Sequence, residues 1–183
     1  MHGRKRVHSP RRRAWPQSVQ RRFVEGASPE LKLAFALLLY TGQRRGDVCK
    51  MRWSDFDGRY ISVTQEKTDE HVAVRVHRDL RAALMKIERR SDYILTTKTG
   101  RPFDKTTLTK AIKKRLREIG EPNLVLHGLR NAAGVKLAES GASVQMIMSV
   151  LGHRSPRMAL YYCEQANKRE LAHKAMRLWE RAA

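Results

Sequence analysis

Apolar residues recur at helical spacing along most of this chain, and the longest apolar stretch predicts a central helix. Residues 28–40 begin with Ser-Pro-Glu, a common helix start, continue almost without a polar break and end just before Gly42. Because this segment is apolar on nearly every side, we expect it to be buried. We expect a helix beginning near Pro16 before it, and a short helix over residues 45–51 after it.

The middle of the chain alternates between apolar and polar residues, which is the period of a β-strand. Residues 59–65 and 71–76 both alternate and are rich in β-branched side chains, and a polar stretch containing Lys67 joins them. This pattern predicts an antiparallel β-hairpin. Residues 93–96 are expected to add a short strand.

Helical spacing returns after the hairpin and continues to the end of the chain. We expect helices over residues 78–89, 106–119, 127–140, 143–150, 155–164 and 167–181. Helices, a small hairpin and more helices make an α+β fold that is mainly helical. Residues 16–183 suffice for one domain with its own core, whereas residues 1–15 are basic, almost free of aliphatic side chains, and expected to form a linker or arm.

The charge balance indicates the kind of partner. Lys and Arg number 38 against 18 Asp and Glu, which gives a formal net charge of +20. A surplus of this size indicates a polyanion, with nucleic acid first and an anionic membrane second. A membrane span is excluded because the longest apolar run, residues 31–40, is about half of the ~20 residues required. Cys49 and Cys163 form no metal-binding pattern and fit a reducing cytoplasm.

Polar residues suited to chemistry lie at turns and helix starts in four short segments. These are residues 41–44, Lys67 in the hairpin, residues 127–130, and residues 151–153 with Tyr161 and Tyr162 beyond them. They supply arginine, lysine, histidine and tyrosine, but not the clustered carboxylates that hold Mg²⁺. Metal-free phosphoryl transfer needs a side-chain nucleophile, cationic donors to the non-bridging oxygens and an acid for the leaving oxygen, and these residue types provide all three.

Taken one at a time, these residues also fit structural roles. Arg44 follows a glycine that ends a helix, and Lys67 is ordinary in an exposed turn. His127 and Arg130 lie one helical turn apart and share a face, which also suits a surface contact. His153 fits a helix cap, and Zn²⁺ is disfavoured because the two histidines have no Cys or carboxylate companions.

Taken together, the segments resemble the tyrosine recombinase, or phage integrase, family over about residues 16–165. Residues 41–48 are similar to its first arginine motif, 65–68 to its lysine hairpin, 127–130 to its His-x-x-Arg motif and 151–153 to its second histidine motif. The resemblance implies the family's catalytic-domain fold, no metal ion or other cofactor, and a catalytic set of Arg44, Lys67, His127, Arg130, His153 and Tyr162, with Asp47 in a supporting position.

The resemblance also implies a mechanism of DNA cleavage and rejoining. Tyr162 attacks a phosphodiester, forms a 3′-phosphotyrosine and releases a 5′-hydroxyl. Arg44 and Arg130 hold the non-bridging oxygens through bidentate donors, and His153 adds a hydrogen bond. The bond energy stays in the protein–DNA linkage, so no ATP is required.

The remaining members of the set move protons or orient the others. The resemblance implies that His127 exchanges a proton with the nucleophile, since imidazole titrates near neutral pH. Lys67 protonates the departing 5′ oxygen. Asp47 orients this shell, at a position where the family more often has Glu. Asn131 stands where the family commonly has another histidine, and no catalytic role is expected for it.

Two adjacent tyrosines leave a choice of nucleophile. Tyr161 and Tyr162 differ by ~100° around a helix, so only one of them faces a given phosphate. Tyr162 lies nine residues after His153, which is the family's usual interval. The resemblance therefore favours Tyr162.

The expected partner is double-stranded DNA, in the cytoplasm of a prokaryotic cell and without a membrane. The family implies a homotetramer on DNA around a Holliday junction, and a monomer or weak oligomer without DNA. The C-terminal helix carries an apolar stripe that docks either on a neighbouring protomer or on its own domain; it consists of Leu171, Met176, Leu178 and Trp179.

Two alternative functions share parts of this evidence. Family members usually carry an N-terminal core-binding domain, and here only the basic residues 1–15 precede the catalytic part, so we expect a fragment or truncated member that holds DNA weakly. A type IB topoisomerase shares the chemistry but is disfavoured by the short motif set. A non-catalytic DNA-binding relic is disfavoured because all six catalytic residue types are present.

Overall fold

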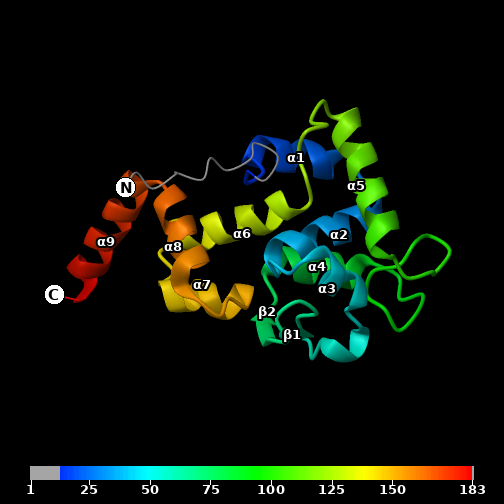
Figure 1. Ribbon diagram of the computed structural model, residues 1–183, viewed down its shortest axis with the longest axis horizontal. Helices are drawn as coiled ribbons and strands as arrows, with labels where there is room; N and C mark the ends of the chain where they lie inside the picture. Colours follow the sequence, from blue (N-terminus) through cyan, green and yellow to red (C-terminus); the bar gives the residue numbers. More distant parts are fainter. Residues whose placement is uncertain (1–12, 183) are drawn as a thin grey trace, which may run out of the picture.

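The computed structural model describes residues 13–182, and it is mainly helical with one small sheet (Figure 1). In chain order the elements are α1 (Gln17–Glu25), α2 (Pro29–Tyr40), α3 (Arg45–Lys50), the 3₁₀ turn η2 (Trp53–Asp55), β1 (Tyr60–Thr64), β2 (His71–Arg75), α4 (Arg78–Lys86), α5 (Lys105–Glu118), α6 (His127–Glu139), α7 (Val144–Leu151), α8 (Pro156–Gln165) and α9 (Lys168–Ala182). The predicted α+β class is confirmed.

The predicted hairpin is present, and its register follows the alternation of the sequence. β1 pairs antiparallel with β2, so that Ile61 lies opposite Val74 and Val63 opposite Val72. These four side chains are buried on one face. The strand predicted at residues 93–96 is wrong for the described chain, because this segment makes only isolated bridges to two different partners and no continuous ladder.

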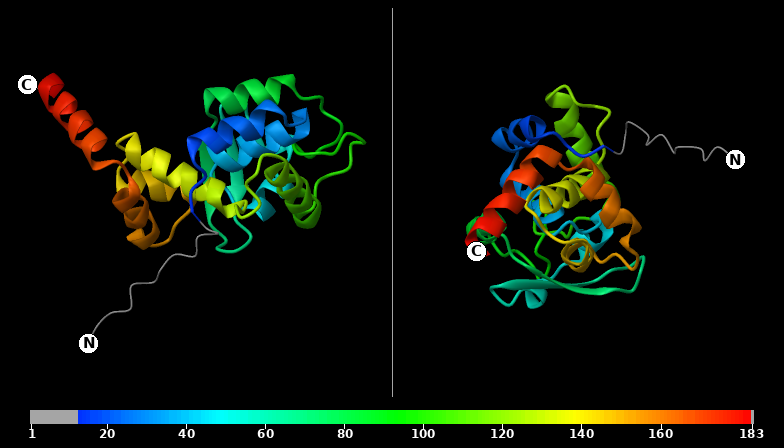
Figure 2. Two further views of the ribbon diagram at one scale, coloured as in Figure 1. Left: turned by 90° about the horizontal axis from the view of Figure 1, so that it is seen from above. Right: turned by 90° about the vertical axis from the view of Figure 1, so that its left-hand side faces the viewer.

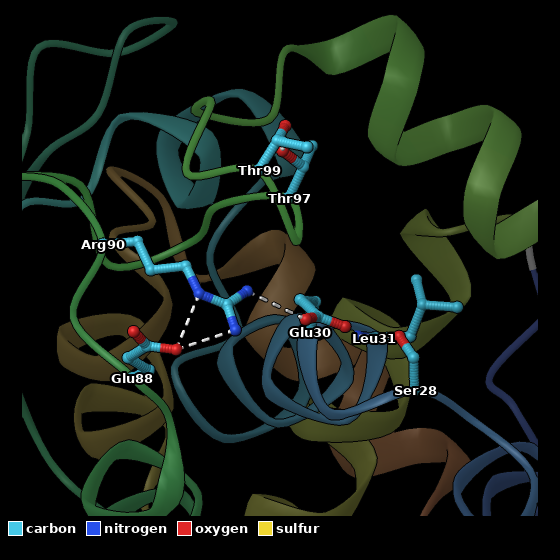
Figure 3. A network of polar contacts seen from close by, with 7 residues as sticks. All are labelled: Ser28, Glu30, Leu31, Glu88, Arg90, Thr97 and Thr99. Atoms are coloured by element: carbon cyan, nitrogen blue, oxygen red, sulfur yellow. Dashed lines mark hydrogen bonds and ion pairs between the residues drawn. The ribbon is translucent and has the colours of Figure 1, made fainter.

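Helix α2 is the centre of the fold, as its apolar pattern predicts. Ser28 caps its N-terminus, with the side-chain oxygen accepting a hydrogen bond from the Leu31 amide at 3.3 Å. The helix is buried on almost every side. Near its start Glu30 is buried as well, and Figure 3 shows its carboxylate bound to Arg90, which also pairs with Glu88.

The core begins earlier in the chain than the sequence indicates. Trp15 was assigned to the basic arm, yet it is 2% exposed and its ring packs edge-on against Phe23. Its indole N–H donates to the Val125 carbonyl at 2.9 Å, which ties the start of the domain to the segment before α6. The charge of the preceding residues obscured this anchor. Residues 1–12 of the predicted arm lie outside the described residues.

Two hydrophobic clusters share α6, and the boundary between them positions the polar residues described below. The first cluster contains buried side chains of α1, α2, the hairpin, α4 and α5, and it reaches α6 at Leu129 and Ala132. The second cluster begins at Ala133 and continues through α7 and α8. Figure 1 shows α6 crossing the molecule between these two groups of helices. We call this boundary, at residues 129–133, the seam.

The last helix differs from the others in its surroundings. Figure 2 shows α9 projecting away from the body of the molecule beyond α8. Its first turns are tied down by Leu171, which packs on the second cluster, and by Lys174, which donates to the Glu139 carbonyl. Within residues 13–182 no helix is both long and apolar enough to cross a bilayer.

The turn after α2 requires a glycine for two reasons, and this generates a stability prediction. Gly42 has a φ of +63°, and a Cβ at this position would lie 2.3 Å from Cδ2 of the fully buried Leu151. We therefore expect Gly42→Ala to lower the free energy of unfolding by about 3 kcal/mol, from left-handed strain plus overpacking. Urea denaturation measures this loss.

Gly120→Ala is the matched control. Gly120 also has a positive φ, +76°, but no atom lies within 4 Å of an added Cβ. It should lose only the strain contribution of about 1 kcal/mol. Equal losses in the two variants would show that the contact with Leu151 is not the cause.

Candidate active site

Arg130 lies at the seam, near the start of α6, and its charge is buried. The side chain is 3% exposed, and its two terminal nitrogens donate to the Gly42 carbonyl at 2.8 Å and to the Leu151 carbonyl at 2.7 Å. Burial, helped by the nearby Arg44, lowers the pKa of the guanidinium to about 10. Arg130 therefore remains charged at neutral pH and links the ends of α2 and α7.

Arg44 is linked to the Leu151 carbonyl through the side chain of Gln65. It stands immediately before α3, half-buried, and donates from Nη1 to Oε1 of Gln65 at 2.6 Å. Nε2 of Gln65 donates in turn to the Leu151 carbonyl at 2.8 Å. A guanidinium has five N–H donors. Within the described chain, recorded hydrogen bonds use two donors of Arg130 and one of Arg44, so each keeps donors for an anion.

His153 follows the left-handed Gly152 that ends α7, and it lies near the positive charges of Arg130 and Arg44. Burial, followed by the positive charges of Arg130 and Arg44, lowers the pKa of His153 from 6.5 to about 4. The ring is therefore neutral at pH 7. Its Nδ1 is buried and has no hydrogen-bond partner within residues 13–182. A neutral imidazole carries one N–H donor, which suits contact with an oxyanion.

Tyr162 stands in the second cluster beside His153. It is 1% exposed, and its ring lies so close to Gly134 that a Cβ there would be 2.4 Å from the ring. Its ring centroid is 6.0 Å from that of His153, and its hydroxyl donates to Oδ1 of Asn131 at 3.2 Å. Burial raises the pKa of this phenol, while Arg130 opposes the rise.

The neighbouring tyrosine occupies a different environment. Tyr161 is half-buried and its ring meets that of Tyr162 edge-on, with centroids 5.7 Å apart. Tyr162 is packed against His153 and is under the influence of Arg130 and Arg44. Tyr162 thus shares an electrostatic environment with His153 and both arginines.

Lys67 and His127 lie at the periphery of this group. Lys67 is exposed in the turn that joins β1 to β2, and His127 is exposed at the first position of α6. His127 is close enough to depress the pKa of His153. The structure thus brings four of the six predicted catalytic residues together at the seam and leaves these two at its edge.

The turn that carries Lys67 is tied to the body by hydrogen bonds and ion pairs. Asp47, which is 3% exposed, accepts the Glu66 amide at 3.0 Å. The Glu66 carboxylate pairs with Lys105 at 2.8 Å, and Glu70 pairs with Arg154, the residue after His153, at 2.6 Å. The Asp47 side chain therefore supports the lysine-bearing turn by accepting a hydrogen bond from the Glu66 backbone amide.

Sequence reasoning missed two polar residues that the structure places in the group. Asn131 was given no role, yet it contacts the Tyr162 hydroxyl. The sequence indicates Gln65 only as part of the lysine motif, yet its side chain is fully buried and contacts Arg44. One signal was available, because Gln65 continues the inward-facing register of Ile61 and Val63, where a polar side chain needs a buried partner.

The basic helix α5 contributes less free charge than its sequence suggests. Lys105 pairs with Glu66, and Arg115 donates to the carbonyls of Arg22 and Phe23. The remaining cations of this helix are exposed; they are Lys110, Lys113, Lys114 and Arg117. Part of the positive charge of this helix therefore stabilises the fold.

The low pKa of His153 predicts a pH dependence of stability. Between pH 6.5 and pH 4 the unfolded chain binds a proton that the folded chain does not, so stability falls as the pH decreases through this window. Relative to His153→Gln, the wild-type protein should lose about 1–2 kcal/mol more between about pH 7 and about pH 4.5, after allowance for solvent screening.

Urea unfolding of both proteins at the two pH values measures this difference, and other titrating groups cancel in the comparison. NMR titration of the His153 ring gives the pKa directly. A ring that protonates at its ordinary value of 6.5 would contradict the prediction.

Comparison with known proteins identifies the family. The model of the phage integrase family matches residues 19–169. The integrase of Mycobacterium phage L5 is 35% identical over 80 residues, which cover 44% of this chain and 22% of that protein. The integrase of Escherichia phage lambda is 30% identical over 146 residues, covering 72% of this chain and 40% of that protein.

A solved structure of related sequence has the same fold. The lambda integrase tetramer bound to a Holliday junction superimposes with a TM-score of 0.73 at 26% identity, over 84% of this chain and 48% of that one. This chain spans less than half the length of these relatives. Because the family model matches most of the chain in sequence and this neighbour matches it in fold, the chain belongs to the phage integrase family, the tyrosine recombinases.

Proposed function

We propose that this chain is the catalytic domain of an enzyme that cleaves and rejoins double-stranded DNA in site-specific recombination, through a 3′-phosphotyrosine. The observation that carries the proposal is the arginine pair at the seam. Arg44 and Arg130 are connected through the Leu151 carbonyl and stand beside a neutral His153 and a buried Tyr162. This is a cationic, hydrogen-bonding group of side chains suited to one phosphodiester.

The arginines hold the phosphate. Two guanidinium groups, each with N–H donors beyond those used in the fold, bind the non-bridging oxygens and offset the charge that develops during attack. His153 adds an N–H donor from a ring that burial keeps neutral. In this arrangement the negative charge of the phosphate offsets the repulsion between the guanidinium groups of Arg44 and Arg130.

The tyrosine supplies the nucleophile. In the structure the Tyr162 hydroxyl donates to Asn131, so attack requires it to leave this partner and face the phosphorus. His127 exchanges the phenolic proton, and Lys67 donates a proton to the departing 5′ oxygen. The P–O bond to the 5′ oxygen breaks as the bond to Tyr162 forms, and the reverse reaction with a new 5′-hydroxyl rejoins the strand.

DNA as substrate is supported by charge and by relationship. The net charge of +20, to which the exposed lysines of α5 contribute, favours a polyanion. The related lambda integrase has been solved on a Holliday junction. We propose that residues 15–183 form the catalytic domain, since Trp15 packs in its core, and that residues 1–14 act as a basic linker or arm.

A suicide DNA substrate, nicked beside the cleavage position, tests this function. The released 5′ fragment diffuses away, so the protein should accumulate as a covalent DNA adduct without added metal. The adduct should disappear in Tyr162→Phe and persist in Tyr161→Phe, because Tyr162 packs beside His153 and lies in the field of both arginines. Gel electrophoresis under denaturing conditions separates the adduct.

The outcomes separate the alternatives. An adduct that survives Tyr162→Phe would disprove the assignment of the nucleophile. DNA binding without an adduct under any condition would favour a non-catalytic relic. Both tyrosine variants must unfold in urea as the wild-type protein does for either result to count.

Helix α9 supports assembly of protomers on DNA. Its second half projects from the body and exposes Met176, Leu178 and Trp179, of which Trp179 is 69% exposed, while Leu171 packs on its own second cluster. Burial of such side chains stabilises an interface. We propose that α9 docks on a neighbouring protomer in a homotetramer on DNA, and that without DNA the chain is a monomer or weak oligomer.

Removing the apolar end of α9 should therefore abolish assembly but not cleavage. The double variant Leu178→Ser, Trp179→Ser should leave adduct formation on the suicide substrate unchanged and yield no tetramer on Holliday-junction DNA in analytical ultracentrifugation. Met85→Ser, which removes a 76% exposed methionine from α4, is the matched control. Tetramers formed equally by both variants would refute docking through α9.

A further inference from the structure

Gln65 has a fully satisfied side-chain amide at the centre of the seam. Its Oε1 accepts hydrogen bonds from Arg44 at 2.6 Å and from the Thr68 hydroxyl at 2.8 Å. Its Nε2 donates to Oε1 of Gln43 at 2.5 Å and to the Leu151 carbonyl at 2.8 Å. The side chain is fully buried, and all four hydrogen-bonding positions of the amide are used.

These contacts allow only one orientation of the amide. A flipped Gln65 would set its NH₂ group against the guanidinium of Arg44, which only donates, and its oxygen against the Leu151 carbonyl, which only accepts. Each reversed contact would leave buried polar atoms unpaired, at a cost in free energy. The network therefore fixes the side chain both in place and in direction.

The partners of Gln65 belong to separate parts of the proposed site. Arg44 is one phosphate-binding group, and the Leu151 carbonyl is also the acceptor of Arg130 at 2.7 Å. Thr68 is the residue after Lys67 in the turn that joins β1 to β2. Gly152, which precedes His153, packs so tightly that an added Cβ would lie 2.4 Å from the Gln65 amide nitrogen.

We propose that Gln65 is a positioning residue that sets Arg44 at a fixed spacing from Arg130, through the Leu151 carbonyl that Gln65 and Arg130 share. This inference rests on the proposed function, because it assigns the two arginines to one phosphate. An arginine side chain has many rotamers, and here two arginine side chains must converge on one phosphate group. Gln65 holds Arg44 in place before DNA arrives, so this ordering is not required during the reaction.

The charge of the scissile phosphate gives a test that separates positioning from folding. In a methylphosphonate a methyl group replaces one non-bridging oxygen, and the group carries no negative charge. It makes little demand on a precisely spaced pair of guanidinium groups. A defect in arginine spacing should therefore be severe on the phosphodiester and mild on the methylphosphonate, whereas a general folding defect should affect both equally.

The variant is Gln65→Met, which keeps the length of the side chain and removes its hydrogen-bonding atoms. Adduct formation on the phosphodiester suicide substrate should fall by about 100-fold relative to wild type. On the methylphosphonate substrate the loss should be at least about tenfold smaller. Urea unfolding shows whether the variant is folded.

A second variant covers the case in which Gln65→Met does not fold. Gln65→Glu has nearly the same shape, and its carboxylate pairs with Arg44 and competes with the phosphate for it. It should show the same selective loss on the charged substrate.

Two control variants sharpen the comparison. Gln20→Met removes another buried glutamine, whose Nε2 donates to the Trp15 carbonyl at 2.8 Å away from the seam, and any loss should be equal on the two substrates. Lys67→Ala should be rescued by a substrate with a sulfur leaving group at the 5′ position, because a thiolate needs no acid. Gln65→Met should not be rescued by that sulfur.

Each result decides the matter. Selective loss on the charged phosphodiester supports the proposal. Equal losses of Gln65→Met on the phosphodiester and the methylphosphonate would make Gln65 merely structural. Rescue of Gln65→Met by the sulfur leaving group would mean that Gln65 acts through Lys67. Either result overturns the proposal. A wild-type protein that forms no adduct refutes the proposed function and this inference with it, whereas unchanged cleavage by Gln65→Met refutes the inference alone.

Discussion

The buried charge of Arg130 is the constraint on which the rest of the structure depends. A guanidinium cannot be removed from water unless hydrogen-bond acceptors meet it, because an unpaired buried charge is far too costly. The acceptors here are the carbonyls of Gly42 and Leu151, which become available where α2 and α7 end. Arg130 therefore joins the ends of two helices at the place where the two hydrophobic clusters meet along α6.

The same requirement gives the site its electrostatic character. Arg44 and Arg130 lie near enough that each disfavours additional positive charge, and burial strengthens this repulsion. His153 responds by remaining neutral to about pH 4. The Tyr162 phenol is held neutral by burial but sits where the arginines favour its anion. An anionic phosphate relieves the repulsion, so the resting protein is arranged for a ligand of negative charge.

The groups of the site divide by depth in a way that fits their chemistry. Arg130, Gln65 and Tyr162 are buried at the seam, where packing fixes their geometry. Lys67 and His127 are exposed at its rim, on a hairpin turn and at a helix start. Groups that bind a phosphate gain from rigid placement and low exposure, whereas groups that exchange protons with substrate and solvent require access. The ion pairs of Glu66 and Glu70 hold the turn in position without covering it.

The sequence by itself determined the features that depend on neighbours along the chain. Helix α2 with its Ser28 cap, the β-hairpin and the order of helices were predicted correctly, because periodicity and capping act within a few residues. The four motifs carried enough pattern to indicate the family. The extra strand at residues 93–96 failed, because its residues pair with two separate partners that local alternation does not specify.

Only the tertiary structure decided how these segments meet. The burial of Trp15 depends on a carbonyl 110 positions away, and the contact between Gln65 and Leu151 spans 86 positions. The Tyr162 hydroxyl finds Asn131 across 31 positions, where the sequence had given Asn131 no role. No local pattern encodes such pairings, because they arise when two clusters close around one buried charge and every polar group at the seam must find a partner.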